Sequence, residues 1–119
     1  MASGSHQAVF YSMSKFLIAS DWGISVKSLD DVADALGASL GRGIVLAEGD
    51  LGPTFFDLRS GLAGELIQKF VNYRVRAAII VATPANYGER FAELAYEHAT
   101  HPTVRFVGSI DEAIEWMTI

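Results

Sequence analysis

The segment that most constrains the fold is residues 55–82, FFDLRSGLAGELIQKFVNYRVRAAIIVA. Its first part repeats apolar residues at the three- and four-residue spacing of one helix face. From residue 75 to residue 82 the run is apolar except for Arg76, which is typical of an interior strand of a parallel sheet. The segment therefore predicts an amphipathic helix that leads directly into a buried strand.

The rest of the chain repeats this alternation of strands and helices. Strands are predicted for the apolar runs: residues 8–14 and 15–20, as one long strand or a hairpin, then 43–47, 75–82 and 104–107. Helices are predicted for the amphipathic stretches: residues 29–40 with Ser28 and Asp31 as a capping box, 57–73, 89–99, and a last helix capped by Ser109 and Glu112. This order predicts an α/β fold with a mostly parallel sheet and helices packed against it.

The composition narrows the classes of protein and of site. A chain of 119 residues suits a single domain, which we expect over residues 8–119, and residues 1–7 resemble a vector remnant. A net charge of −5 without a basic stripe argues against nucleic-acid binding. The lack of cysteine excludes disulfides and Cys-ligated zinc and favours a cytoplasmic protein. No apolar run approaches the ~20 residues that span a bilayer, so no membrane association is predicted.

The central helix has two distinct faces. Asp57 is its predicted N-cap, and Ser60 is a second candidate. At about 100° per residue, a wide apolar arc is predicted to face the core: Leu62, Leu66, Ile67, Phe70 and Val71. Beside it runs a stripe of small and amide residues: Gly61, Gly64, Gln68 and Asn72. Glu65 and Lys69 lie next to the stripe as a favourable pair four residues apart.

The stripe on the central helix needs an explanation, because each interior glycine costs about 1 kcal/mol relative to alanine. One interpretation is that another helix or loop packs closely on it. The other is that a ligand or partner approaches it, with Gln68 and Asn72 as hydrogen-bonding groups. The N-terminal end, at Arg59, Ser60 and Gly61, could also hold an anion, although Asp57 as a cap with Arg59 as its surface partner explains the same residues.

The block at residues 55–82 closely resembles the bacterial domain-of-unknown-function family 4180, and the resemblance extends over roughly residues 8–119. The block is also similar to the second helix of STAS domains, the fold of anti-sigma-factor antagonists. Asp57, Ser60, Gly61 and Leu62 match the acid, serine, glycine and leucine that open that helix, with one extra residue in the spacing. The resemblance implies a STAS-like domain, a protein partner such as a kinase or regulator, and phosphorylation at Ser60.

Two loops depart from the pattern of the uncharacterised family. Ala82 and Thr83 stand where Gly-Asp is expected after the central strand. Residues 98–102, HATHP, stand where an Asn- and Arg-rich turn is expected. If these loops build a family site, this chain has lost that site or changed its ligand.

No catalytic or cofactor motif is present in the sequence. His98 and His101, with Glu93 and Glu97 nearby, need a further converging ligand to hold a metal and otherwise form a solvated helix end. The acids of residues 48–57 lack the spacing of a calcium loop, and no nucleophile-elbow, dinucleotide or Walker pattern occurs. We therefore predict no cofactor, no metal and no catalytic residue.

The predicted function is that of a small regulatory or protein-interaction domain. Its interaction surface is predicted to comprise Asp57, Arg59, Ser60 and Gly61, flanked by Gly64, Gln68 and Asn72. The alternative is a small-molecule-binding protein or enzyme with a pocket beside the Gly61, Gly64 and Gln68 stripe, using Gln68, Asn72 or Tyr73 for polar contacts. A homodimer that buries the stripe is a further possibility.

Overall fold

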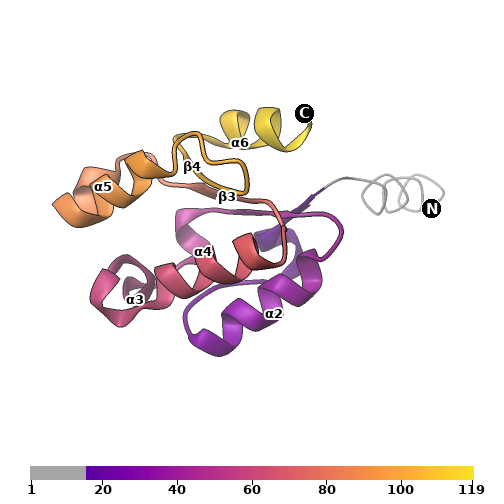
Figure 1. Cartoon of the computed structure of the whole chain (residues 1–119), viewed down its shortest axis with the longest axis horizontal. Coiled ribbons are helices and arrows are strands. Elements are labelled where there is room, and N and C mark those ends of the chain that lie inside the picture. The colour runs from indigo at the N-terminus through magenta and orange to yellow at the C-terminus, as the bar shows by residue number, and fades with distance from the viewer. Residues whose placement is uncertain (1–15) are drawn as a thin grey trace.

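Within residues 16–119, four parallel strands form one sheet, in which they lie in chain order (Figure 1). The strands are β1 (Leu17–Ile18), β2 (Ile44–Leu46), β3 (Ala77–Ile80) and β4 (Val104–Val107). Each pairs in parallel with the next one along the chain. The structure is a computed structural model that describes residues 16–119. The predicted α/β fold with a parallel sheet is confirmed.

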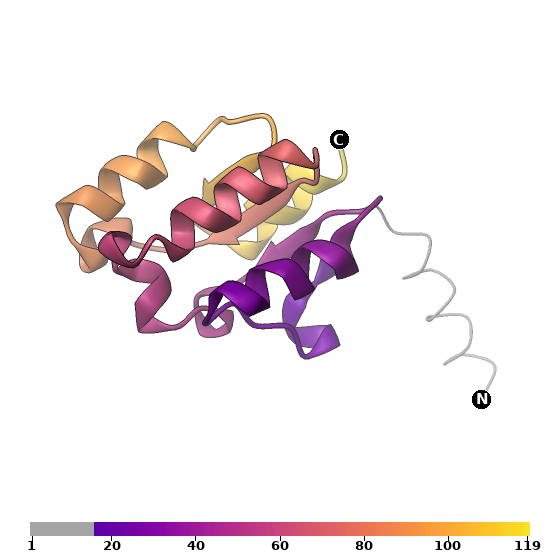
Figure 2. The same ribbon diagram turned by 60° about the horizontal axis from the view of Figure 1, so that its bottom comes forward.

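Helices cover both faces of this sheet. The helices are α2 (Leu29–Ser39), α3 (Pro53–Phe56), α4 (Leu62–Asn72), α5 (Glu89–Glu97) and α6 (Ile110–Met117). Short 3-10 turns join them: η1 (Ala19–Trp22), η2 (Glu48–Asp50), η3 (Leu58–Ser60) and η4 (Pro84–Tyr87). Because parallel neighbours in chain order are linked by crossovers of one hand, α2, α4 and α5 lie on the same face of the sheet (Figure 2). The last helix, α6, packs on the opposite face (Figure 1).

Two hydrophobic cores follow from this arrangement. The larger core joins the sheet to α2, α4 and α5 and contains the fully buried Leu66, Phe70 and Phe91. The smaller core lies under α6 and is built around Val45, Ala78, Ala113, Trp116 and Met117. Successive residues of β3 enter opposite cores, so the strand is buried on both faces. This burial explains the unbroken apolar run in the sequence.

Several local predictions are confirmed and others are corrected. The hydroxyl oxygens of Ser28 and Ser109 accept hydrogen bonds from the amides of Asp31 and Glu112, as the capping boxes predict. The predicted strand at residues 15–20 is wrong beyond Ile18, because the chain turns into η1 and then into Gly23 with a left-handed φ of 67°. The predicted strand at residues 8–14 lies outside the described residues.

Candidate functional site

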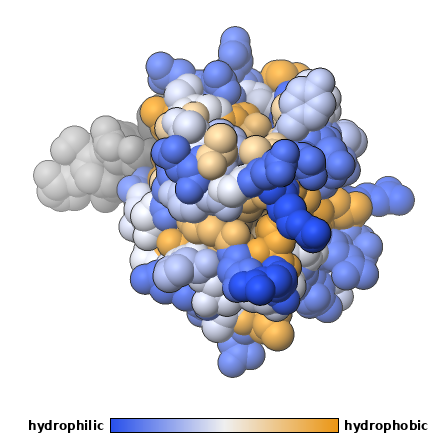
Figure 3. Space-filling view, turned by 90° about the vertical axis from the view of Figure 1, so that its left-hand side faces the viewer, coloured by the Kyte–Doolittle hydropathy of each residue, from blue (hydrophilic) through white to orange (hydrophobic). Residues whose placement is uncertain are grey.

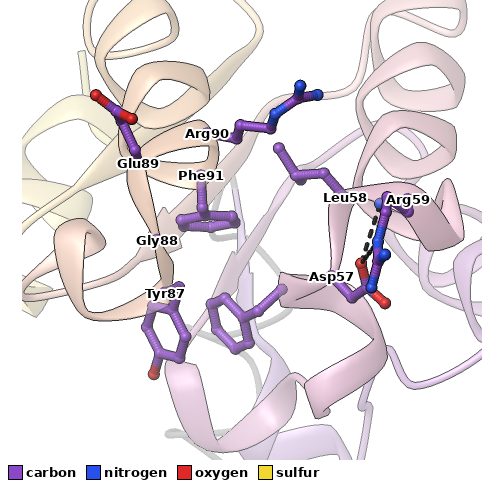
Figure 4. Close-up of a pocket in the computed structure, with 9 residues that line it drawn as sticks. Asp57, Leu58, Arg59, Tyr87, Gly88, Glu89, Arg90 and Phe91 are labelled. Atoms are coloured by element: carbon purple, nitrogen blue, oxygen red, sulfur yellow. Dashed lines mark hydrogen bonds and ion pairs between the residues drawn. The ribbon is translucent and has the colours of Figure 1, made fainter.

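A cleft opens at the carboxyl ends of β2 and β3. It has a volume of about 600 Å³ and lies between the segment that follows β2 and the segment that follows β3. Its lining residues are Phe56, Asp57, Leu58, Arg59, Tyr87, Gly88, Glu89, Arg90 and Phe91 (Figure 4). We call this the edge cleft. Ligand sites in open α/β sheets lie at this end of the strands, where the connecting loops are free to vary.

The floor of the edge cleft is aromatic. The rings of Phe56 and Tyr87 stack with centroids 3.7 Å apart and planes 9° from parallel. Phe91, from the first turn of α5, meets the ring of Phe56 edge-on at 5.1 Å and is fully buried. Phe56 belongs to α3 and Tyr87 to η4, so these contacts hold together two segments that are far apart in the sequence.

Glu48 fixes the wall formed by η4. One of its carboxylate oxygens accepts a hydrogen bond from the hydroxyl of Tyr87, and the other accepts one from the amide of Ala82 at 3.2 Å. The hydrogen bond to Glu48 raises the pKa of Tyr87 above its ordinary value, with smaller contributions from burial and from the negative charge of Glu48. The loop after β2 and the loop after β3 are therefore tied together through charged and aromatic side chains.

The rim of the edge cleft carries charged groups from both walls. Asp57 Oδ1 accepts hydrogen bonds from the backbone amide of Arg59 at 3.1 Å and from its Nε at 3.3 Å. The Arg59 side chain is 91% exposed, and its terminal guanidinium nitrogens are not used in this pair. On the other wall, Arg90 extends toward Leu58 while Glu89 points away from the cleft (Figure 4). Figure 3 shows this end of the molecule, where apolar side chains lie in a hollow flanked by strongly hydrophilic ones.

The start of α4 differs from the prediction. Asp57 is not the N-cap of the central helix, because it caps the short η3 turn instead. The N-cap of α4 is Gly61, whose φ of 81° lies in the left-handed region that favours glycine. Ser60, the second candidate cap, accepts a hydrogen bond from the amide of Leu62 at 3.2 Å. The Ser60 hydroxyl also donates to the Thr54 carbonyl at 2.7 Å, which joins α3 to the start of α4.

The glycine and amide stripe lies open on the surface of α4. Gly61, Gly64, Gln68 and Asn72 are all exposed, whereas the predicted core arc on the other side of the helix is buried or partly buried. A Cβ atom added at Gly61 or Gly64 would meet nothing within 4 Å among the described residues. No helix or loop within residues 16–119 therefore packs closely there, contrary to the first interpretation. The backbone conformation explains Gly61, and nothing in the structure explains Gly64.

Two further cavities lie on the same side of the molecule as the larger core. One, of about 320 Å³, lies between α2 and α4 and is bordered by Glu65 and Lys69. These two residues form the ion pair that the sequence predicts, with Lys69 Nζ 3.8 Å from Glu65 Oε2. The other, of about 460 Å³, lies between α5 and the end of β4 and includes Ala82 and Thr83. None of the three cavities described in residues 16–119 is lined by Gly61, Gly64, Gln68 or Asn72.

The structure brings together only part of the predicted site. Asp57 and Arg59 line the edge cleft, whereas Ser60, the next residue along the chain, does not. The stripe residues Gly64, Gln68 and Asn72 do not line it. The sequence analysis missed the contributors from outside the central block: Glu48, Tyr87 and Arg90. The available signal was that these residues follow predicted strands, because the loops after parallel strands meet at one edge of the sheet.

Residues 16–119 contain neither a metal-binding cluster nor a helix that could cross a membrane. No group of three or more histidine, aspartate or glutamate side chains is arranged to share a metal ion in this part of the chain. The rings of His98 and His101 are tilted by 34° with their centroids 5.1 Å apart, and the Nδ1 atom of each contacts backbone groups. None of the described helices has both the length and the apolar character needed to cross a bilayer.

Comparison with known families identifies the chain. A family described as Domain of unknown function (DUF4180) matches residues 12–117, and the chain belongs to this family. No curated protein and no solved structure matches the chain. The resemblance to STAS domains therefore stays a prediction.

Proposed function

We propose that the protein is a small STAS-like regulatory domain that binds a partner protein through the edge cleft. The observation that supports this proposal is the build of the cleft, in which an aromatic floor is surrounded by charged groups on two loops that Glu48 holds together. We further propose that the protein is bacterial, as the family resemblance suggests, and cytoplasmic, as the lack of cysteine suggests.

The composition of the edge cleft fits protein recognition. Protein interfaces combine an apolar centre with a polar rim, and they are enriched in aromatic residues and arginine. Here Phe56 and Leu58 supply partly buried apolar surface, and Arg59 and Arg90 supply guanidinium groups. Arg90 forms no ion pair among residues 16–119. The partner segment that fits best places an apolar side chain on the floor and a carboxylate near the two arginines.

Ser60 would act as the switch of this surface. Its hydroxyl hydrogen is donated to the Thr54 carbonyl, and a phosphate on Oγ removes that donor. The modification would add roughly −1.5 to −2 charges next to the Arg59 guanidinium and the first amides of α4. Phosphorylation would therefore release α3 from the start of α4 and change the wall of the edge cleft.

Cross-linking in the native cell tests the proposed surface. A photoreactive residue at Leu58 should capture one defined protein, while the same residue at Asp34, which is exposed on α2, should not. Arg59→Ala combined with Arg90→Ala should lower the yield at Leu58 by about tenfold or more, because arginines of this kind commonly dominate interface energies. Equal capture at both positions, or capture that is insensitive to the two arginine substitutions, would contradict the proposal.

A second candidate function is small-molecule binding in the same cleft. Its volume of about 600 Å³ falls within the usual range for ligand sites. Native mass spectrometry of protein purified gently from its own cell separates the two candidates. A small molecule that is retained non-covalently and is lost in Leu58→Trp protein, in which the larger side chain fills the cleft, would favour the ligand. The absence of a retained ligand together with position-specific cross-links would favour the protein partner.

A further inference from the structure

The free edge of the sheet is covered by a set of specific hydrogen bonds. The edge strand β4 pairs with β3 on one side, where the carbonyls of Thr103 and Val107 accept from β3 and the residue that follows it. The amides of the alternate residues point to the other side, because the pattern repeats every two residues. These outward amides are all bound: Val104 to His101 Nδ1 at 3.2 Å, Phe106 to the His98 carbonyl at 3.2 Å, and Gly108 to Glu112 Oε1 at 2.8 Å.

Among these three acceptors, His101 is the one that changes its bonding capacity near neutral pH. Its Nδ1 atom accepts from the amide of Thr103 at 3.0 Å and from that of Val104 at 3.2 Å. Two donors facing one ring nitrogen require a lone pair there, so the ring is neutral with its hydrogen on Nε2. The guanidinium of Arg105 holds the same loop by donating to the carbonyls of His101, at 2.8 Å, and Thr100, at 3.3 Å.

The charged groups around His101 oppose its protonation. His98 contributes a second imidazole from the end of α5, and Arg105 contributes a guanidinium from β4. Arg105 and Arg76, at the start of β3, both stack on Trp116 of α6, so these elements also bring positive charge. No carboxylate among residues 16–119 forms an ion pair with the ring. Burial lowers the pKa of His101 below its ordinary value, and His98 and Arg105 lower it further.

We propose that neutral His101 caps the start of β4 and that its protonation under mildly acidic conditions opens the loop between α5 and β4. Protonation replaces the Nδ1 lone pair with an N–H group, so both backbone hydrogen bonds are lost and three donors face one another. The Val104 amide is then left unpaired on the free edge of the sheet. His98 behaves differently, because its Nδ1 hydrogen is donated to the Leu94 carbonyl at 3.0 Å and is retained when the ring is charged.

The sign of the pH effect follows from the direction of the shift. A histidine whose pKa is lower in the folded protein than in the unfolded chain contributes its full stability above the unfolded value of about 6.5. Below that value the unfolded chain binds the additional proton first. The contribution is therefore lost progressively as the pH falls from about 6.5 toward the folded pKa of His101.

Amide hydrogen exchange in wild-type and His101→Asn protein tests the cap. The asparagine oxygen reaches the amide two residues ahead and does not titrate. Between about pH 7 and about pH 5, the protection factors of the Thr103 and Val104 amides should fall about tenfold in wild type, the equivalent of one hydrogen bond, and stay level in His101→Asn. His98→Gln is the matched control and should keep the fall, with a slightly higher midpoint because one repulsive charge is gone.

An equal fall in wild type and His101→Asn would overturn the proposal. Nitrogen NMR shifts of the wild-type imidazole decide the question if His101→Asn fails to fold. An Nδ1 lone pair near pH 7 that becomes protonated in step with the loss of Val104 protection supports the cap. A hydrogen on Nδ1 near pH 7, or a ring that stays neutral at about pH 5, contradicts it.

Discussion

The two ends of the sheet both carry arginine and aromatic side chains, but they use them differently. At the amino end, Arg76 and Arg105 stack on Trp116 with distances of 4.3 and 4.7 Å to the ring centroid, and both donate to backbone carbonyls. At the carboxyl end, Arg59 and Arg90 border an open cleft, and within residues 16–119 neither uses its terminal guanidinium nitrogens in an ion pair. The difference indicates that the arginines of the amino end stabilise the fold, whereas those of the carboxyl end are the ones to which we assign the proposed binding.

The largest expected effect on stability is at the amino end of the sheet. Trp116→Ala should lower the free energy of unfolding by about 3–5 kcal/mol, because it empties the core under α6 and removes the surface on which both guanidiniums stack. Trp116 is only 5% exposed, whereas Tyr96 on α5 is 84% exposed. Tyr96→Ala is therefore the control and should change stability by no more than about 0.5 kcal/mol. Chemical denaturation measures the free energy of unfolding of both variants. A Trp116→Ala protein as stable as the Tyr96→Ala control would contradict a stabilising role for Trp116 and the two arginines that stack on it.

Substitutions at two glycines of the central helix sharpen the comparison within the carboxyl end. Gly61→Ala should destabilise the protein by about 1–2 kcal/mol, because Gly61 has a left-handed φ of 81°. Gly64→Ala should stabilise it by up to about 1 kcal/mol, because Gly64 is helical and no atom of residues 16–119 lies within 4 Å of an added Cβ. Thermal unfolding of the pair measures the two signs, and destabilisation by Gly64→Ala would reveal a conformational requirement that the fold does not show.

Light scattering on wild type and Gly64→Leu tests the predicted homodimer at the same stripe. A dimer that buries Gly64 should dissociate when the larger side chain is introduced. A mass that is the same in both proteins would remove this interface from consideration.

The fold was largely predictable because its signals are local. The apolar run that became β3 and the serines that cap α2 and α6 each act within a few residues. The start of α4 was misplaced, since Asp57 has the chemistry of a cap and only the backbone shows that η3 intervenes. Of the nine residues that line the edge cleft, the predicted interaction surface contains only Asp57 and Arg59. Tyr87 joins Glu48 across 39 residues, a distance over which sequence periodicity carries no information.

The link between Glu48 and Tyr87 gives a prediction for the rigid part of the edge cleft. Glu48→Ala should return the pKa of Tyr87 from its raised value toward about 10, because the hydrogen bond to Glu48 is the main cause of the shift. The hydrogen bond stabilises the protonated phenol, so its contribution is present below about pH 10 and is lost as the pH rises through the folded pKa. Ultraviolet titration of the phenolate measures the change, and Tyr87→Phe identifies the signal by removing it. An unchanged titration in Glu48→Ala would mean that the loop after β2 does not hold η4.

The smallest expected effect on stability is the one that bears most on function. Arg59→Ala should change the free energy of unfolding by no more than about 1 kcal/mol, because its ion pair with Asp57 is exposed to solvent. Arg90→Ala should change it by less than about 0.5 kcal/mol, since its side chain is exposed and forms no ion pair among residues 16–119. Denaturation curves that coincide with wild type, together with the loss of cross-linking at Leu58, would separate binding from folding at this end. A large destabilisation by either substitution would instead place these arginines with Arg76 and Arg105, as parts of the fold.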